Sequence, residues 1–121
     1  MILTSAACLA LNVYFEARSE SITGQQMIAE VTMNRVDSDK YPNTVCDVVY
    51  QNRQFSWTQD GKSDTPRDAV AWKGAQAVAH EALDGDRLGS EALYYHADYV
   101  SPGWAKRLTW VGQVGQHQFY K

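Results

Sequence analysis

Residues 14–21 read Tyr-Phe-Glu-Ala-Arg-Ser-Glu-Ser, which ends an apolar segment and enters a polar break. Glu16 places one carboxylate beside two aromatic residues, at the C-terminal end of a helical pattern. The negative end of a helix dipole and an apolar wall both disfavour the charged form of a carboxylate. Glu16 is therefore expected to hold a proton near neutral pH, the state that a general acid needs to cleave a glycosidic bond.

Apolar residues at helical spacing predict a helix on each side of this break, over residues 3–18 and 24–36. Ser21 or Thr23 can cap the start of the second helix, because both carry a hydroxyl that accepts from a backbone N–H. A short apolar run at residues 45–50 favours one further helical turn.

A third helix is the clearest of the predicted elements. Thr65 is its expected N-cap, Pro66 stands at the first helical position, and Gly85 ends it. Trp72 lies on its apolar face and is expected in the core. The polar residues 51–64 before this helix form a long loop, and loops of this length in a small domain are often functional.

The last part of the chain changes to β-rich sequence. Short strands are predicted over residues 92–96, 108–111 and 117–120, with a hairpin turn at 112–115. Mainly helical sequence followed by a short antiparallel β element predicts an α+β fold. At 121 residues the chain has room for one core, so residues 1–121 are expected to form a single domain.

Composition argues against several classes of partner. The net charge of −3 and the pI near 5.5 disfavour nucleic-acid binding, which usually needs a basic face. No apolar stretch reaches the ~18 residues that indicate a membrane span. Residues 1–11 are apolar but lack a basic start and a cleavage-like break. We interpret them as the beginning of the first helix and expect no signal peptide.

A series of motifs runs in order along nearly the whole chain. They are CLALNVYFEARSE (8–20), GQ (24–25), VTMNRV (31–36), YPNTVC (41–46), QFSW (54–57) with DG (60–61), ALYYH (92–96) and GQHQFY (115–120). In this order they resemble the SleB-type cell-wall hydrolases, a family of peptidoglycan-cleaving lytic enzymes with a small lysozyme-like fold.

The resemblance implies cleavage of the glycan strand between N-acetylmuramic acid and N-acetylglucosamine, and it maps the catalytic glutamate onto Glu16. A lytic transglycosylase needs only one acid. Once that acid protonates the leaving oxygen, the C6 hydroxyl of muramic acid attacks the anomeric carbon and a 1,6-anhydro sugar forms. Most glycosidases instead use two carboxylates. If Glu20, Glu30 or Asp60 lies opposite Glu16, hydrolysis by water is the alternative.

The loop around residue 55 offers the groups that a sugar-binding groove uses. Aromatic faces pack on pyranose rings, and amides or hydroxyls bind N-acetyl arms. Gln54, Ser56 and Trp57 are therefore predicted to line a groove. Phe55 is equally well explained by core packing.

Tyr94, Tyr95 and His96 alternate along one predicted strand, so Tyr94 and His96 share a face and Tyr95 takes the other. All three are candidates for substrate binding, and Tyr95 is expected to face the groove. A structural role with satisfied hydrogen bonds is the alternative for His96.

Two arginines are interpreted as structural. Arg18, near a helix C-terminus, complements the dipole and can pair with Glu20 or Asp37, and a role as a substrate ligand is the alternative. Arg35 is expected to be a partly buried guanidinium that pins the loop after its helix.

The histidines and cysteines indicate less about function than the residues above. His80, His96 and His117 lack metal-ligand spacing, so neither a metal nor another cofactor is expected.

Relatives of this type commonly carry a further cysteine pair that is missing here. The resemblance therefore suggests a disulfide between Cys8 and Cys46, with two buried free thiols as the alternative.

The expected partner is peptidoglycan, bound by a monomer at the bacterial wall in the periplasm or outside the cell. A phage endolysin made in the host cytoplasm and released by a holin is one interpretation, and a catalytic domain excised from a longer exported protein is another. Two other function classes stay open. One is a non-catalytic glycan-binding module, and the other is a metal-dependent wall amidase or peptidase.

Overall fold

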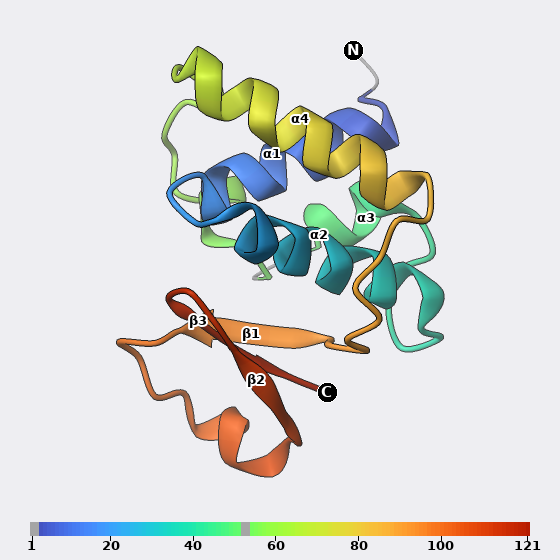
Figure 1. The fold of residues 1–121 in the computed structure, drawn as a ribbon, viewed down its shortest axis with the longest axis vertical. Coiled ribbons are helices and arrows are strands. Elements are labelled where there is room, and N and C mark those ends of the chain that lie inside the picture. Colours follow the sequence, from blue (N-terminus) through green and yellow to red (C-terminus); the bar gives the residue numbers. More distant parts are fainter. Residues whose placement is uncertain (1–2, 52–53) are drawn as a thin grey trace.

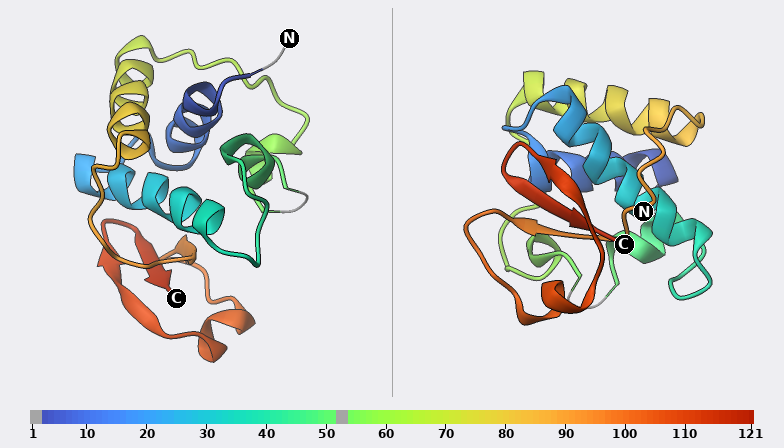
Figure 2. Two further views of the ribbon diagram at one scale, coloured as in Figure 1. Left: turned by 90° about the vertical axis from the view of Figure 1, so that its right-hand side faces the viewer. Right: turned by 60° about the horizontal axis from the view of Figure 1, so that its bottom comes forward.

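The computed structural model describes residues 3–51 and 54–121, with the helices gathered on one side and a small sheet on the other (Figure 1). The α-helices are α1 (Ser5–Ala17), α2 (Ile22–Asp37), α3 (Val45–Val49) and α4 (Ala69–Leu83). Short 3-10 turns lie between α3 and α4, at η1 (Ser56–Thr58), and later in the chain at η2 (Gly103–Arg107). Helix α2 runs on the side of α1 and α4 that faces the sheet (Figure 2). The predicted α+β fold is confirmed.

Side-chain caps fix where the helices begin. The Ser21 hydroxyl accepts from the N–H of Gly24 at 3.1 Å, so Ser21 rather than Thr23 caps α2. Helix α4 begins at Ala69 with Asp68 as its N-cap, so the predicted start at Thr65 and Pro66 was wrong. The reason is tertiary, because the Tyr14 hydroxyl binds the backbone N–H groups just before α4.

The sheet holds three antiparallel strands, β1 (Tyr94–Ala97), β2 (Trp110–Val114) and β3 (His117–Tyr120), in the order β1-β3-β2. The predicted hairpin turn was placed too early. The turn is Gly115-Gln116, where Gly115 has a φ of 57°. Gly112 lies within β2, at a register irregularity that a glycine accommodates easily.

The core lies between the helices and extends to the central strand. Its largest fully buried side chains include Leu9, Val13, Tyr14, Ile28, Val31 and Phe119. Trp72, which was predicted to lie in the core, is partly buried and packs against the core, where it meets the Tyr14 ring edge to face at 6.0 Å. Cys8 and Cys46 form a disulfide that joins α1 to α3, which resolves the alternative that the sequence left open.

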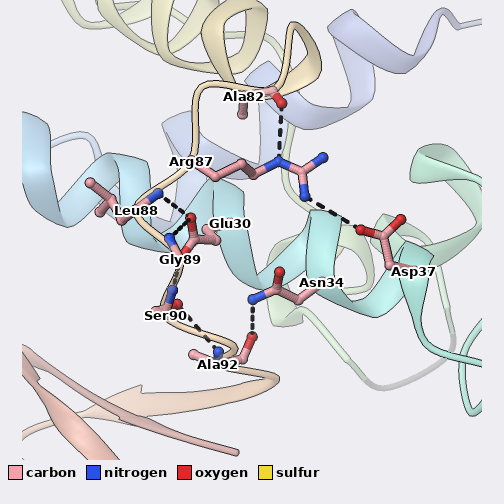
Figure 3. Close-up of polar contacts among 9 residues, drawn as sticks. All are labelled: Glu30, Asn34, Asp37, Ala82, Arg87, Leu88, Gly89, Ser90 and Ala92. Atoms are coloured by element: carbon pink, nitrogen blue, oxygen red, sulfur yellow. Dashed lines mark hydrogen bonds and ion pairs between the residues drawn. The ribbon is translucent and has the colours of Figure 1, made fainter.

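The connection between α4 and β1 is tied to α2 by a buried carboxylate (Figure 3). Glu30 is 2% exposed, and it accepts hydrogen bonds at 2.5, 3.1 and 2.7 Å from the backbone N–H groups of Leu88, Gly89 and Ser90. One turn later, Asn34 Nδ2 donates to the carbonyl of Ala92 at 2.9 Å. These bonds fix where β1 begins and hold the sheet against the helices.

Candidate active site

Glu16 lies at the junction of the helices and the sheet. It is the penultimate residue of α1, and its Oε1 accepts a hydrogen bond from the Tyr95 hydroxyl of β1 at 2.5 Å. The Glu16 side chain also lines a cavity of about 160 Å³, together with Ser19, Glu20, Ala97, Tyr99, Gln116 and His117. The carboxyl group is thus held by one strand while it faces an opening.

Burial raises the pKa of Glu16. Three groups act in the opposite direction and lower the pKa: the Tyr95 hydrogen bond, then the charges of His117 and Arg35. Burial outweighs them, so the carboxyl keeps its proton to higher pH than an ordinary glutamate. The direction that the sequence predicted is confirmed, and burial, which corresponds to the predicted apolar wall, is its main cause.

Tyr95 is a fixed and neutral donor. Its ring stacks on Phe55 with centroids 6.3 Å apart and meets His117 edge to face at 5.4 Å. Burial, and then the proximity of Glu16, raise the pKa of Tyr95 well above its usual range. The hydroxyl therefore stays protonated and donates to Glu16 throughout the physiological range.

A second, larger cavity adjoins this pair. Its volume is about 430 Å³, and its walls are Arg35, Tyr41, Gln54, Tyr94, Tyr95, Trp104, Arg107 and Leu108. Because Tyr95 lines the larger cavity and Glu16 the smaller one, the hydrogen-bonded pair lies between them. This arrangement can hold an extended ligand on both sides of one protonated carboxyl group.

The structure brings some of the predicted binding residues together. Gln54, Tyr94 and Tyr95 line the larger cavity, and Ser56 lies exposed on η1 outside both cavities. Trp57 is in the core instead of the groove, so its predicted position was wrong.

Specific contacts explain why Trp57 is buried and how His96 is held in place. Trp57 Nε1 donates to Asn12 Oδ1 at 2.8 Å, and its ring stacks on Phe15. His96 Nε2 lies 2.8 Å from the Tyr120 hydroxyl, and His96 Nδ1 lies 2.7 Å from the carbonyl oxygen of Ala97. His96 lines neither cavity, and its alternative role as a satisfied structural histidine is the one the structure supports.

Of the three candidates for a second carboxylate, only Glu20 is near Glu16. Glu30 is occupied in anchoring the connection to β1, as described above. Asp60 is exposed and caps a turn through the N–H of Lys62. Glu20 lines the smaller cavity, but its Oε1 accepts from the Gln116 N–H at 3.0 Å and lies 2.8 Å from His117 Nδ1.

The contacts of Arg18 and Arg35 differ in part from those that were predicted. Arg18 is structural, but its Nη1 donates to the Tyr14 hydroxyl at 2.9 Å instead of pairing with Glu20 or Asp37. Arg35 is buried and fixes the chain before β1 through a 2.8 Å hydrogen bond from Nε to the Leu93 carbonyl. It lines the larger cavity as well, which a purely structural interpretation missed.

Sequence reasoning missed four further walls of the larger cavity: Tyr41, Trp104, Arg107 and Leu108. Trp104 and Arg107 lie in the short η2 turn, Tyr41 and Leu108 lie outside the helices and strands, and none of these segments has apolar periodicity. The one available signal was the closeness of Trp104 and Arg107 in a loop after Pro102, where aromatic and cationic side chains have no core to fill.

Two negative findings apply to residues 3–51 and 54–121. No three His, Cys, Asp or Glu side chains are grouped closely enough to hold a metal ion. No helix in this part of the chain has the length and apolar character to span a membrane.

Comparison with known sequences gives consistent matches. Residues 19–120 match the profile of the cell wall hydrolase family. A spore cortex-lytic enzyme of Oceanobacillus iheyensis is 33% identical over 119 residues, which cover 93% of this chain and 40% of that relative. The corresponding enzyme of Bacillus subtilis is 33% identical over 117 residues, covering 92% and 35%. The chain therefore spans less than half the length of these relatives.

Two solved structures have the same fold. The catalytic domain of the germination-specific lytic transglycosylase SleB from Bacillus anthracis superposes with a TM-score of 0.84 at 31% identity, covering 100% of this chain and 97% of that domain. The catalytic domain of the Bacillus cereus SleB protein gives a TM-score of 0.79 at 30% identity, covering 100% and 93%.

Proposed function

The chain belongs to the cell wall hydrolase family, and we propose that it cleaves the peptidoglycan strand between N-acetylmuramic acid and N-acetylglucosamine. The observation that carries the proposal is the raised pKa of the Glu16 carboxyl between two cavities. A buried carboxyl group that keeps its proton is suited to general acid catalysis at a glycosidic oxygen. The similarity to a lytic transglycosylase domain supports the same reaction.

The proposed reaction uses one carboxyl group twice. Glu16 donates its proton to the bridging oxygen, and the bond from the anomeric carbon to that oxygen breaks. The C6 hydroxyl of the muramyl residue then bonds to the anomeric carbon, and its proton passes to the Glu16 carboxylate. The products are a 1,6-anhydromuramyl end and a free N-acetylglucosamine end, with Glu16 protonated again.

The neighbours of Glu16 support this cycle. The Tyr95 hydrogen bond fixes the direction of the carboxyl group, and it strengthens when Glu16 is ionised. The charge of Arg35 favours the same ionised state. Glu20 is already bound to Gln116 and His117, so it is a poor candidate for activating a water molecule.

We propose that one chain acts alone, because both cavities and the carboxyl group belong to the same chain. Residues 1–121 then act as a single catalytic domain at the bacterial wall. The near-complete overlap with an isolated catalytic domain supports this division.

The test compares two glutamate-to-glutamine variants on purified sacculi. Glu16→Gln keeps the shape of the side chain but removes the acid, and a loss of about 10²–10⁴-fold in the rate of lysis is expected. Glu81→Gln makes the same change on the exposed face of α4 and is expected to lyse normally.

Binding to sacculi, measured by sedimentation, separates the remaining function classes. Glu16→Gln is expected to bind as the unchanged protein does. Lysis that survives in this variant rejects Glu16 as the acid. Binding without any lysis by the unchanged protein points to a glycan-binding module, and lysis that stops with a chelator points to a metal-dependent amidase.

A further inference from the structure

The larger cavity is cationic as well as aromatic. Arg35 and Arg107 are among the walls that the structure describes, and none of those walls is an aspartate or glutamate. A neutral sugar needs no cationic wall, because its hydroxyl and amide groups are bound by neutral donors and acceptors. Two guanidinium groups at one cavity therefore indicate a ligand with negative charge.

Arg35 is the more unusual of the two. It is 4% exposed, yet its partners are neutral: the Leu93 carbonyl, the Gln54 side chain at 3.1 Å, and nearby aromatic rings. Within residues 3–51 and 54–121, no carboxylate lies within ion-pair distance of it. Its charge acts on the Glu16 carboxyl group, but burial keeps that group protonated and therefore neutral. Buried charges in proteins are normally paired, because an unpaired charge loses its hydration without compensation. An anionic ligand in the adjoining cavity would provide that pairing.

Arg107 is placed differently. It is the last residue of η2 and is exposed at the cavity wall, so it can reorient to meet a ligand. Tyr94 and Trp104 lie beside it with ring centroids 5.9 Å apart, and both rings line the same cavity. Aromatic faces suit the C–H surface of a pyranose ring, and guanidinium groups suit a carboxylate.

We propose that the larger cavity binds a muramyl residue through its carboxylate, which lies between Arg35 and Arg107. The inference rests on the proposed function and adds a basis for substrate choice. In the glycan strand only the muramyl residue carries a lactyl ether with a carboxyl group. The negative charge comes either from that carboxylate when it is free or from the stem peptide when one is attached.

The test measures binding of small ligands by NMR titration, so it does not depend on catalysis. N-acetylmuramic acid is compared with its carboxamide, which differs only in charge, and with muramyl dipeptide, which carries its carboxylate on the peptide. The proteins are the unchanged chain, Arg107→Gln, and Lys106→Gln as a matched control. Lys106 is the neighbouring exposed cation and is not a cavity wall.

The unchanged protein is expected to bind the acid about fivefold or more tightly than the amide, with smaller preference at high salt. Arg107→Gln should remove most of this preference, and Lys106→Gln should keep it. If muramyl dipeptide binds more tightly than N-acetylmuramic acid, the recognised charge is on the stem peptide. If it binds more weakly than N-acetylmuramic acid, the recognised charge is on the lactyl group.

Equal binding of acid and amide overturns the proposal, as does a preference that survives in Arg107→Gln or disappears equally in Lys106→Gln. Absence of any binding at the resonances of the cavity walls also overturns it. Lysis of sacculi by the same preparation is recorded alongside. A protein that lyses sacculi without preferring the acid contradicts this inference alone, whereas a protein that prefers the acid without lysis contradicts the proposed function alone.

Discussion

The Tyr95 hydroxyl and the Glu16 carboxyl group form a 2.5 Å hydrogen bond between residues 79 positions apart in the sequence. This bond connects β1 to the end of α1, and each partner lines a different cavity. The position of the proposed acid therefore depends on how the sheet docks against the helices, and the Glu30 contacts hold that docking in place.

Tyr95→Phe removes the hydroxyl while keeping the ring, and we expect kcat on sacculi to fall about tenfold because Glu16 loses its orientation. The hydrogen bond lowers the pKa of Glu16, so its removal should raise that pKa further. The reaction needs protonated Glu16, so the alkaline limb of the pH–rate profile should move to higher pH.

Tyr50→Phe is the matched control, because Tyr50 is partly exposed beside Trp57 and lines neither cavity. A profile of Tyr95→Phe that coincides with those of Tyr50→Phe and the unchanged protein would mean that the hydroxyl has no influence on the acid.

Glu20→Gln distinguishes one catalytic carboxyl group from two. We expect this variant to retain lysis within about tenfold, since Glu20 holds the β2–β3 turn through Gln116 and His117 and has no proton-transfer role in the proposed single-acid reaction. Initial rates are compared with those of Glu16→Gln, after circular dichroism confirms that both proteins are folded. If a folded Glu20→Gln protein is as inactive as Glu16→Gln, the single-acid scheme is wrong and a two-carboxylate hydrolysis replaces it.

The sequence predicted the position of Glu16 at the edge of the core because the signal for it is local, whereas its role as the acid was inferred from the family resemblance and remains a proposal. An apolar helical segment that ends in a polar break places a carboxyl group at the edge of a core, and the structure has that arrangement. The alternation of strand residues predicted opposite faces for Tyr94 and Tyr95 with the groove on one of them, but both side chains line the larger cavity. The strand pattern did not identify Glu16 as the hydrogen-bond partner of Tyr95, because Glu16 lies on another element.

Other features depend on tertiary contacts that no local pattern contains. Gln54 and Trp57 are three positions apart in one loop, yet Gln54 lines a cavity and Trp57 enters the core. Asn12 from α1 binds the Trp57 indole N–H and thereby makes its burial favourable. The start of α4 was misplaced for a similar reason, since the Tyr14 hydroxyl holds the preceding backbone outside the helix.

Glu30→Gln tests the anchor of the sheet. Burial by itself raises the pKa of Glu30, but hydrogen bonds from the Ser90, Gly89 and Leu88 groups outweigh burial and lower it. We expect the variant to be less stable by about 2 kcal/mol at neutral pH, because three backbone donors lose a charged acceptor.

The stability difference should depend on pH in a defined direction. A carboxyl group with a lowered pKa in the folded state stabilises above its unfolded pKa of about 4.3 and loses this effect as the pH falls through its folded value. Urea unfolding of both proteins from pH 7 to pH 3 should therefore show a difference that shrinks with acid. A difference that is constant or grows over this range is incompatible with a Glu30 anchor that acts as a carboxylate.

Reduction of the Cys8–Cys46 disulfide should lower stability without affecting the site. The bridge closes a loop with a sequence separation of 38, which corresponds to about 2–4 kcal/mol of stabilisation. Thermal unfolding with and without reductant measures the loss, and the Cys8→Ser, Cys46→Ser double variant controls for effects of the reductant. Lysis at temperatures where both forms are folded should be equal. Identical unfolding temperatures for the oxidised and reduced forms would argue against the bridge.

Mass spectrometry of the muropeptides released from purified sacculi tests the single-acid reaction of Glu16 most directly. The predicted products end in 1,6-anhydromuramic acid and are lighter by one water than hydrolysed muropeptides, and Glu16→Gln releases none of them. Reducing muramic acid ends from the unchanged protein, or anhydro products released by Glu16→Gln, would contradict it.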